Sequence, residues 1–376
     1  KIREAPAYGQ KPLQGGKMEQ IMEDPSRFRS EWVRKSRRFS RGSFCMLFLI
    51  LSIVSIFCFI QACERKPVKR LPSFEQITQK DGLSSEMVYA IAVQGDEVWF
   101  GTYGGGATLY DRVKKTWKAY TTKGEPPEQV DDGDSVRWKN ILSYNHVSVI
   151  LPDRDRIWFG TYFYGFGGGG ISYYDPQRNP PWKPFNTNGG RAKKVVSMAL
   201  DGESLWVGSE KGLNLLDKRA EGWKDFYSTQ NGLSGNFVNA ILVQPDFLWV
   251  ATNGGITRVQ KDRKAWKTYC EKEGLTEMEI KSLVKAGPRI LAGGIGGTLF
   301  EYDSASDSWR KIESADPLKN GGIHSITVTN EKAFICRDNG VSIYHFSTGQ
   351  WESLTTSDGL LSNTVFCAAV DQDSIW

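Results

Sequence analysis

Three stretches of the sequence carry the side chains best suited to bind a ligand: residues 123–146, 162–170 and 186–194. Aromatic rings lie there beside glycines and charged groups, as in the run YFYGFGGGG. Flat rings flanked by hydrogen-bonding groups suit sugar rings or short peptides. The same rings could instead form a small satellite core under long loops. The candidate ligand-binding residues are Tyr103, Asp131, Asp132, Asp134, Arg137, Trp138, Tyr162, Phe163, Tyr164, Phe166 and Arg191.

Catalytic and metal-binding patterns are not found. The three histidines, His146, His324 and His345, form no HExxH motif and no pair at ligand spacing. The acidic residues 131–134 could hold a cation but lack the ligand pattern of an EF-hand loop. GGIGG at 293–297 follows no parallel βα unit, which favours a turn over a phosphate loop. We therefore expect no enzyme activity, no metal and no cofactor.

A repeat explains most of the aromatic residues. A large apolar residue recurs about every 42 residues, which is the length of one four-stranded propeller blade. A second aromatic residue follows each by about 18 residues, at the place of an outer strand. Aspartates that recur between the first and the second aromatic residue of a repeat are predicted to close turns. The first series is Trp99, Trp158, Trp206, Trp249, Leu291, Phe334 and Trp376; the second is Trp117, Trp182, Trp223, Trp266, Trp309 and Trp351; the aspartates are Asp111, Asp175, Asp217 and Asp303.

The repeated phrase points to a family. DGLSSEMVYAIAVQGDEVWFGTYGGG at 81–106 returns as NGLSGNFVNAILVQPDFLWVATNGG at 231–255. The phrase resembles the two-component regulator propeller repeat of bacterial extracytoplasmic sensors. The resemblance covers about residues 74–376 and implies an all-β, seven-bladed β-propeller whose last blade is incomplete. We expect residues 74–78 to supply the outer strand of that blade and its third strand to lie beyond Trp376, which protects exposed sheet edges.

The propeller topology predicts where the candidate residues meet. In an up-and-down blade, the turn between the second and third strands lies on the same face as the connection to the next blade. The three candidate stretches occupy such turns and connections in the first three blades. Loop insertions that gather on one face often form the binding face.

The N-terminal part is expected to handle export and anchoring. Residues 1–43 are basic and predicted to be a disordered cytoplasmic segment or the n-region of a signal, and 64–73 a linker. The apolar run at 44–63 is long enough for one hydrophobic helix. Either it remains as a membrane anchor through residues 44–62, or it is a lipoprotein signal with lipidation at Cys63; the sequence leaves both open. The propeller would then lie in the periplasm or outside the cell.

Charge and resemblance together limit the function. The basic excess lies in residues 1–70, so the remaining body is slightly acidic and unlike a nucleic-acid-binding domain. The resemblance implies the ligand-binding sensor module of a two-component-type signalling protein; with the aromatic loops it favours an oligosaccharide or another small extracellular ligand. The alternatives are a stand-alone lipoprotein propeller that binds proteins and a propeller lyase or hydrolase. A homodimer is possible in each case.

Overall fold

The computed structural model describes residues 74–122, 129–131, 136–138, 142–162, 169–312, 315–371 and 374–376. The segments predicted at 1–43, 44–63 and 64–73, with Cys63 and the expected hydrophobic helix, lie outside these residues. Within the described ranges, no helix has the length and apolar character needed to cross a bilayer.

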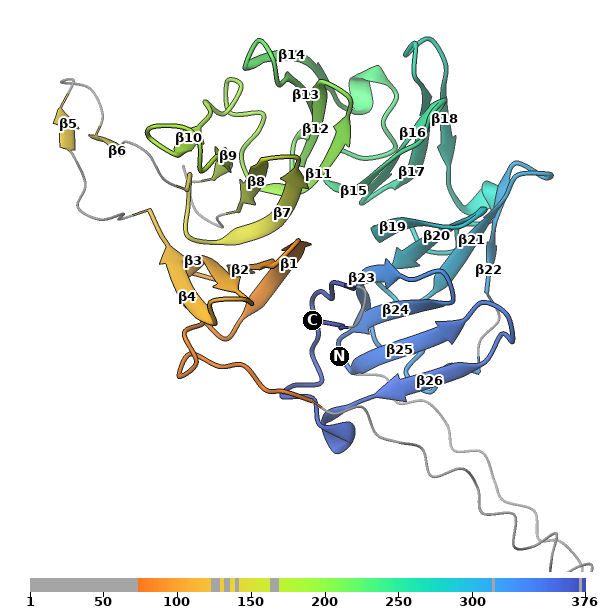
Figure 1. Ribbon diagram of the computed structural model, residues 1–376. Coiled ribbons are helices and arrows are strands. Elements are labelled where there is room, and N and C mark those ends of the chain that lie inside the picture. Colours follow the sequence, from red (N-terminus) through yellow and green to blue (C-terminus); the bar gives the residue numbers. More distant parts are fainter. Residues whose placement is uncertain are drawn as a thin grey trace, which may run out of the picture. The chain divides into compact units, whose positions relative to one another are not determined.

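The predicted repeat folds into six four-stranded antiparallel sheets, and in each sheet the strands pair in chain order (Figure 1). The first three sheets are β1 (Val88–Gln94), β2 (Glu97–Thr102), β3 (Gly106–Asp111) and β4 (Thr116–Tyr120); β7 (Val147–Asp153), β8 (Arg156–Thr161), β9 (Gly170–Tyr174) and β10 (Trp182–Pro184); and β11 (Val195–Asp201), β12 (Ser204–Ser209), β13 (Gly212–Asp217) and β14 (Gly222–Tyr227).

The next three sheets are β15 (Val238–Val243), β16 (Phe247–Thr252), β17 (Gly255–Gln260) and β18 (Trp266–Tyr269); β19 (Ile280–Ala286), β20 (Arg289–Gly294), β21 (Leu299–Asp303) and β22 (Ser308–Lys311); and β23 (Ile323–Val328), β24 (Lys332–Arg337), β25 (Gly340–His345) and β26 (Trp351–Leu354). A two-stranded ribbon, β5 (Gln129–Asp131) and β6 (Val136–Trp138), lies within the insertion after β4. The described residues also form the short 3₁₀ helices η2 (Thr229–Asn231), η3 (Glu271–Glu273) and η4 (Thr356–Asp358).

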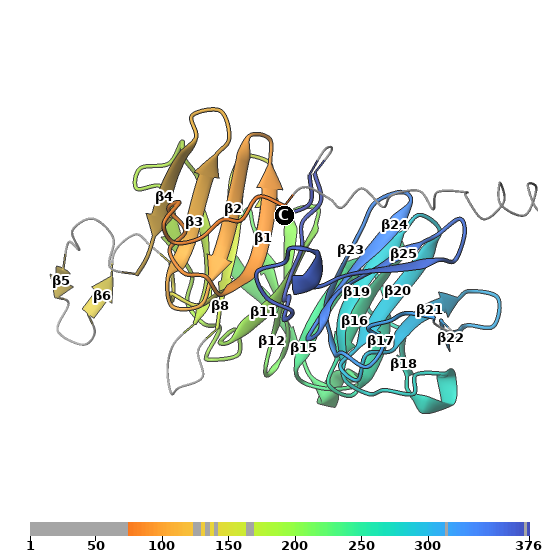
Figure 2. The same ribbon diagram turned by 90° about the horizontal axis from the view of Figure 1, so that it is seen from below.

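The sheets are arranged as the blades of a propeller. Their first strands, β1, β7, β11, β15, β19 and β23, contact one another in sequence and surround the centre (Figure 1). Figure 2 shows the strands of the sheets running between the same two faces. Five core clusters combine residues of consecutive sheets; one, for example, joins Trp249 of β16 to Phe300 of β21. A single sheet therefore cannot bury its own apolar faces, and stability comes from the stacking of neighbours.

The recurring large apolar residue is the centre of each core. In all six second strands, one half-buried residue is followed by five buried ones. Leu291 and Phe334, which replace tryptophan in the fifth and sixth repeats, are 0% and 5% exposed. These two departures from the pattern change the packing and leave the fold intact.

The repeated GLS phrase is architectural. The Ser84 N–H donates to Thr108 Oγ1 at 3.1 Å, and Thr108 Oγ1 donates to Ser84 Oγ at 2.6 Å. Ser234 makes the same pair of bonds with Thr257, at 2.8 and 3.1 Å. Each GLS thus fastens the incoming connection to the second and third strands of its own blade. The phrase returns because the first and fourth blades use the same fastening.

The aspartates and the glycine run predicted to form turns do so. Asp111 Oδ1 accepts the N–H groups of Val113 and Lys114 at 3.0 and 2.9 Å, and Asp175, Asp217 and Asp303 accept bonds from residues two or three positions on in the same way. In the GGIGG turn, the N–H groups of Gly296 and Thr298 donate to the Glu277 carboxylate at 2.7 and 3.0 Å. This turn therefore binds an anion from its own chain.

The prediction of seven blades is wrong for the described residues, which contain six. Beyond η4, residues 359–371 and 374–376 form one isolated bridge, between Val370 and Ile375, and no sheet. Residues 74–78 form no strand either. The Gln76 side chain nevertheless donates to the Gly359 carbonyl at 3.5 Å, and Phe74 packs against Gly359. Residues 359–371 and 374–376 are called the seventh unit below.

Candidate ligand-binding rim

The second turns and the incoming connections of the blades lie together, because one hydrogen bond that joins them is repeated from blade to blade. The residue after a second strand donates its N–H to the carbonyl of the residue before the inner strand. This bond joins the second turn to the incoming connection, so both lie on one face, as predicted. We call that inner edge the rim. The bonds are Tyr103 to Met87, Tyr162 to His146, Asn253 to Phe237, Ile295 to Glu279 and Asp338 to Gly322, at 2.9 to 3.2 Å.

A β-bulge lies at the start of every inner strand of the six sheets. The register shifts between the first and third residues of each strand, which leaves the second residue unpaired with the neighbouring strand. Bulges re-aim side chains and are frequent beside functional sites. The bulged residues are Tyr89, Ser148, Val196, Asn239, Lys281 and His324.

Aromatic side chains form a continuous row along part of the rim. Phe366 of the seventh unit stacks on Tyr89, with ring centroids 4.4 Å apart and planes at 14°. Tyr89 then contacts His146 at 4.9 Å, and His146 makes edge contacts with Tyr103 at 4.6 Å and Tyr162 at 5.6 Å. We call these five residues the aromatic arc. It joins the seventh unit to the first two blades.

A charged or polar pair lies at each end of the aromatic arc. At one end, the His324 ring lies 4.9 Å from Phe366, and His324 Nε2 is 2.7 Å from Asp338 Oδ1. At the other end, Lys194 Nζ lies 5.9 Å from the Tyr162 ring and 2.6 Å from Glu210 Oε2. The rim therefore offers flat apolar surface between two groups that can bond to hydroxyls or amides.

His146 is the buried member of the aromatic arc. Burial lowers its pKa to about 4, because the surroundings penalise the charged imidazolium. At neutral pH the ring is therefore an uncharged partner for the three tyrosines around it. Tyr103, in contrast, is 45% exposed and free to contact a ligand from solvent.

Exposed apolar side chains gather on this face. Large apolar residues that remain exposed in contiguous patches commonly mark binding surfaces. Of the eight large hydrophobic side chains that are exposed in the described residues, five lie in second turns or incoming connections: Met87, Tyr103, Met278, Ile295 and Leu361.

The structure brings together two of the predicted site residues, Tyr103 and Tyr162. Arg191 lies apart from them, because its guanidinium stacks on Phe226 of the outer strand β14 at 4.8 Å. Asp131, Arg137 and Trp138 belong to β5 and β6, whose backbone alone is described. Asp132, Asp134, Phe163, Tyr164 and Phe166 lie outside the described residues.

Sequence reasoning missed Tyr89, His146, Phe366 and His324. Tyr89 and His324 hold the second position of their inner strands, after Val88 and Ile323, and Phe366 holds the matching position of the seventh unit, after Val365. An alignment of the repeats, compared at this second position, would have identified these three residues. The bulge that turns this column toward the rim has no signal of its own in a single repeat.

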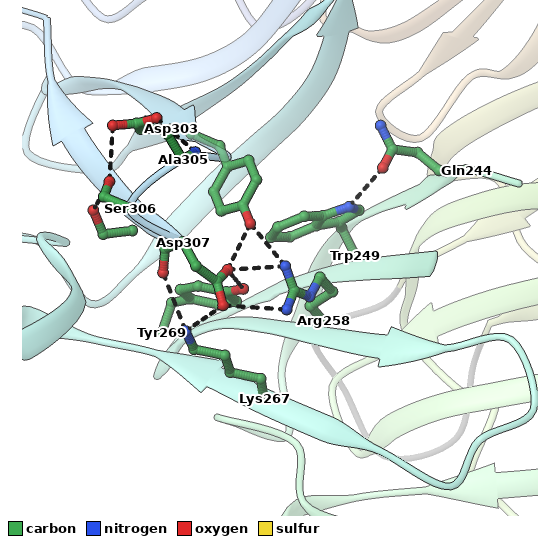
Figure 3. Close-up of polar contacts among 11 residues, drawn as sticks. Gln244, Trp249, Arg258, Lys267, Tyr269, Asp303, Ala305, Ser306 and Asp307 are labelled. Atoms are coloured by element: carbon green, nitrogen blue, oxygen red, sulfur yellow. Dashed lines mark hydrogen bonds and ion pairs between the residues drawn. The ribbon is translucent and has the colours of Figure 1, made fainter. Parts of the chain in front are cut away.

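A second dense polar cluster lies between the fourth and fifth sheets and is structural (Figure 3). The Asp307 carboxylate accepts bonds from Lys267 Nζ at 2.7 Å, Tyr269 Oη at 2.7 Å and Tyr302 Oη at 2.5 Å. Arg258 adds bonds at 2.9 and 3.3 Å. Asp307 belongs to the fifth sheet's outer turn, and Arg258, Lys267 and Tyr269 to the fourth sheet. The cluster thus fastens neighbouring blades together.

Asp307→Asn is expected to lower the free energy of unfolding by about 1 kcal/mol at pH 7, because the carboxylate is 38% exposed and solvent weakens its bonds. Partial burial raises the pKa of Asp307, but the bonds from Lys267, Tyr302 and Tyr269 and the charge of Arg258 outweigh it and hold the pKa well below its ordinary value. A carboxyl with a lowered folded pKa stabilises the protein above its unfolded pKa of about 3.9. Urea unfolding should show this difference shrinking as the pH falls below about 4; a difference that grows in acid would contradict it.

Metal binding has no support in the part of the chain that the structure describes, where no three His, Cys, Asp or Glu side chains gather as a cation site would require. Cys270, Cys336 and Cys367 are free thiols.

Comparison with known proteins defines the fold and no more. No family model and no curated protein matches the chain. The solved structures that match include two extracellular domains named for hybrid two-component systems of B. thetaiotaomicron, BT3049 (17% identity, TM-score 0.63) and BT4673 (19%, 0.58). They cover 80% and 81% of this chain, which spans only 40% and 38% of theirs. The WD40 repeats of RRP9 match at 11% identity and a TM-score of 0.51, over 71% of this chain and 79% of that one. The resemblance predicted from the repeats is thus confirmed at the level of the fold: this chain is a β-propeller similar to the extracellular domains of two-component systems.

Proposed function

We propose that the propeller is the extracytoplasmic ligand-binding module of a signalling protein and that it binds a carbohydrate on the aromatic arc. The observation that carries the proposal is the exposed Tyr103 ring, supported from below by His146 and flanked along the rim by further rings. Aromatic faces bind the apolar faces of sugar rings, and polar groups beside them fix orientation. The likeness to extracellular domains of two-component systems supports the signalling role.

Tethering completes the proposal. Residues 44–62 would anchor the chain in the membrane, or Cys63 would carry a lipid, with the propeller on the outer side. The proposed module binds and does not catalyse: His146 is buried and uncharged at neutral pH, and His324 has a single carboxylate partner in Asp338. A general acid and base pair flanking a substrate is not assembled at the described rim.

Tyr103→Ala is the test of this site. The full chain, purified in detergent, is applied to a glycan array, and the affinity of each retained glycan is measured by calorimetry. Loss of an exposed stacking ring is expected to weaken binding at least about 10-fold, which corresponds to about 1.4 kcal/mol. The melting temperature should change little, because Tyr103 is half exposed.

Val113→Ala is the matched control, since Val113 is 72% exposed in the turn between β3 and β4, away from the rim. It should bind like the wild type. A wild-type chain that retains no glycan, or a Tyr103→Ala variant that binds normally, would show that the proposal is wrong.

A protein-binding platform is the second candidate, favoured by the exposed Met87, Met278, Ile295 and Leu361 on the same face. These side chains are aliphatic and unlike a sugar site. Under this alternative, Met278→Lys or Ile295→Lys would abolish partner binding and leave the glycan measurements unchanged.

A further inference from the structure

We propose that the rim selects neutral sugars and rejects sugars that carry a carboxylate or a sulfate group. This inference rests on the proposed function and names the class of sugar that the aromatic arc would bind. The observation behind it is the pairing of the charged side chains along the rim.

Three positions in each of the six blades lie at the rim: the residue before the inner strand, the second residue of that strand and the residue after the second strand. Most of them hold aromatic, aliphatic, hydroxyl or amide side chains. His146 is among these, and it is uncharged at neutral pH because burial lowers its pKa to about 4. The positions that can carry a charge occur in only three blades. They are Lys194 and Glu210 in the third blade, Glu279 and Lys281 in the fifth, and His324 and Asp338 in the sixth.

Each basic group at these positions is paired with a carboxylate of its own blade. The nitrogen and oxygen atoms lie 2.5 to 2.7 Å apart in the pairs Lys194 with Glu210, Lys281 with Glu279, and His324 with Asp338. The paired side chains are 22% to 57% exposed, so a ligand on the rim can reach both members of a pair. The imidazole is charged only when protonated. The formal charge of these positions is therefore zero or negative, never positive.

Such pairs suit hydroxyl groups better than anions. A hydroxyl both donates and accepts, so it can bond to the basic group and to the carboxylate of one pair. A carboxylate or sulfate on a sugar only accepts. It would meet a basic group whose charge is already balanced, beside a protein carboxylate that repels it. Placing like charges opposite each other is an effective way to reject a wrong partner.

Two of the pairs lie at the ends of the aromatic arc, where they would act on the same ligand as the rings. Lys194 Nζ is 5.9 Å from the Tyr162 ring, and the His324 ring is 4.9 Å from the Phe366 ring. A sugar stacked on either end ring would therefore bring its substituents to a charged pair. A hydroxyl there gains hydrogen bonds, whereas an acidic group is repelled.

Glu210→Gln is the test variant, because it removes the carboxylate beside Lys194 and keeps a hydrogen-bonding side chain of the same size. Glu210 is 26% exposed, so the substitution should leave the fold intact. Glu203→Gln is the matched control. Glu203 lies in the same blade, in the turn between β11 and β12 on the face opposite the rim, where it is 3.9 Å from Arg154. Both substitutions change the net charge equally, and only Glu210→Gln changes the rim.

The full chain in detergent is applied to a glycan array that holds neutral, uronate-containing and sulfated oligosaccharides. The wild type is expected to retain neutral glycans and to exclude the acidic ones. Calorimetry then compares the most strongly retained hexose oligosaccharide with the same oligosaccharide whose C6 hydroxyls are oxidised to carboxylates, as in mannohexaose and hexamannuronate or cellohexaose and hexaglucuronate. The wild type should bind the neutral probe at least about 10-fold more tightly than the oxidised one.

Glu210→Gln should bind the oxidised probe about 5- to 10-fold more tightly than the wild type does, because Glu210 no longer balances the charge of Lys194. Asp338→Asn should act in the same direction, since it removes the repelling carboxylate at the other end of the aromatic arc. Glu203→Gln should stay within about 2-fold of the wild type for both probes.

Three results would overturn the inference. The wild type could bind acidic glycans as tightly as neutral ones; neither Glu210→Gln nor Asp338→Asn could improve binding of the oxidised probe; or Glu203→Gln could improve it as much as Glu210→Gln, so that net charge and not pairing decides. An array that retains no glycan of any kind would instead refute the proposed function, and the selection with it.

Discussion

Arg337→Met should lower the free energy of unfolding by about 3–5 kcal/mol, because it leaves a buried carboxylate without its cation. Arg337 is 1% exposed, and its Nη2 donates to Asp316 Oδ2 at 2.7 Å. Its other bonds go to Ser342 Oγ and to the carbonyls of Gly297 and Gly321, at 2.8 to 2.9 Å. The guanidinium thus joins the fifth and sixth blades where the sixth repeat lacks GLS.

The double variant Arg337→Met with Asp316→Leu is the control for this result. Replacing both members of a buried ion pair by apolar groups removes the unpaired charge, so the double variant should be more stable than Arg337→Met alone. Urea unfolding followed by tryptophan fluorescence measures each difference. A single variant that loses less than about 1 kcal/mol would mean that the pair is not buried in solution.

Gly274→Ala is expected to be the most damaging change within a repeated GL phrase, with a loss of at least about 3 kcal/mol. Gly274 caps η3 with a φ of 92°, where an L-residue is strained. A Cβ at this position would lie 1.8 Å from the backbone oxygen of Trp309 in β22. The connection and the outer strand would have to separate, which opens the edge of the fifth blade.

Gly287→Ala separates the two causes. Gly287 also has a positive φ, of 59°, but an added Cβ meets no atom within 4 Å. It should lose only about 1 kcal/mol, the cost of backbone strain alone. Thermal unfolding of both variants measures the contrast. Equal losses would show that strain, rather than the approach of β22, makes the glycine necessary.

These two predictions concern how blades tolerate departures from the repeat. The sixth repeat lacks GLS and uses the Arg337–Asp316 pair. The fifth has Gly294 where the first four repeats have Thr or Ser, and it uses the Glu277 carboxylate. In both blades, polar backbone groups of the turn and its connection therefore have hydrogen-bond partners. A repeat that looks degenerate in sequence can therefore remain a complete blade.

The fold was largely predictable because local and periodic patterns specify it. Buried residues recur at each second strand, the Asp111-type turns bond to their own backbone, and GLS fastens the connections into the first and fourth blades. All of these depend on residues close in sequence or on one repeat interval, which a single sequence displays. The number of sheets was not predictable in this way, since the described residues 359–371 and 374–376 carry the start of the pattern and form only a bridge.

The sequence by itself determined the repeat, the propeller class and the face on which turns and connections meet, because a blade of about 42 residues can bury its apolar sides only against like neighbours. The tertiary structure alone decided which side chains share that face. Phe366 and Tyr89 are separated by more than half the chain and stack because the last unit returns to the first. The bulges that turn Tyr89 and His324 toward the rim arise from the pairing of whole strands, which no single stretch of residues encodes.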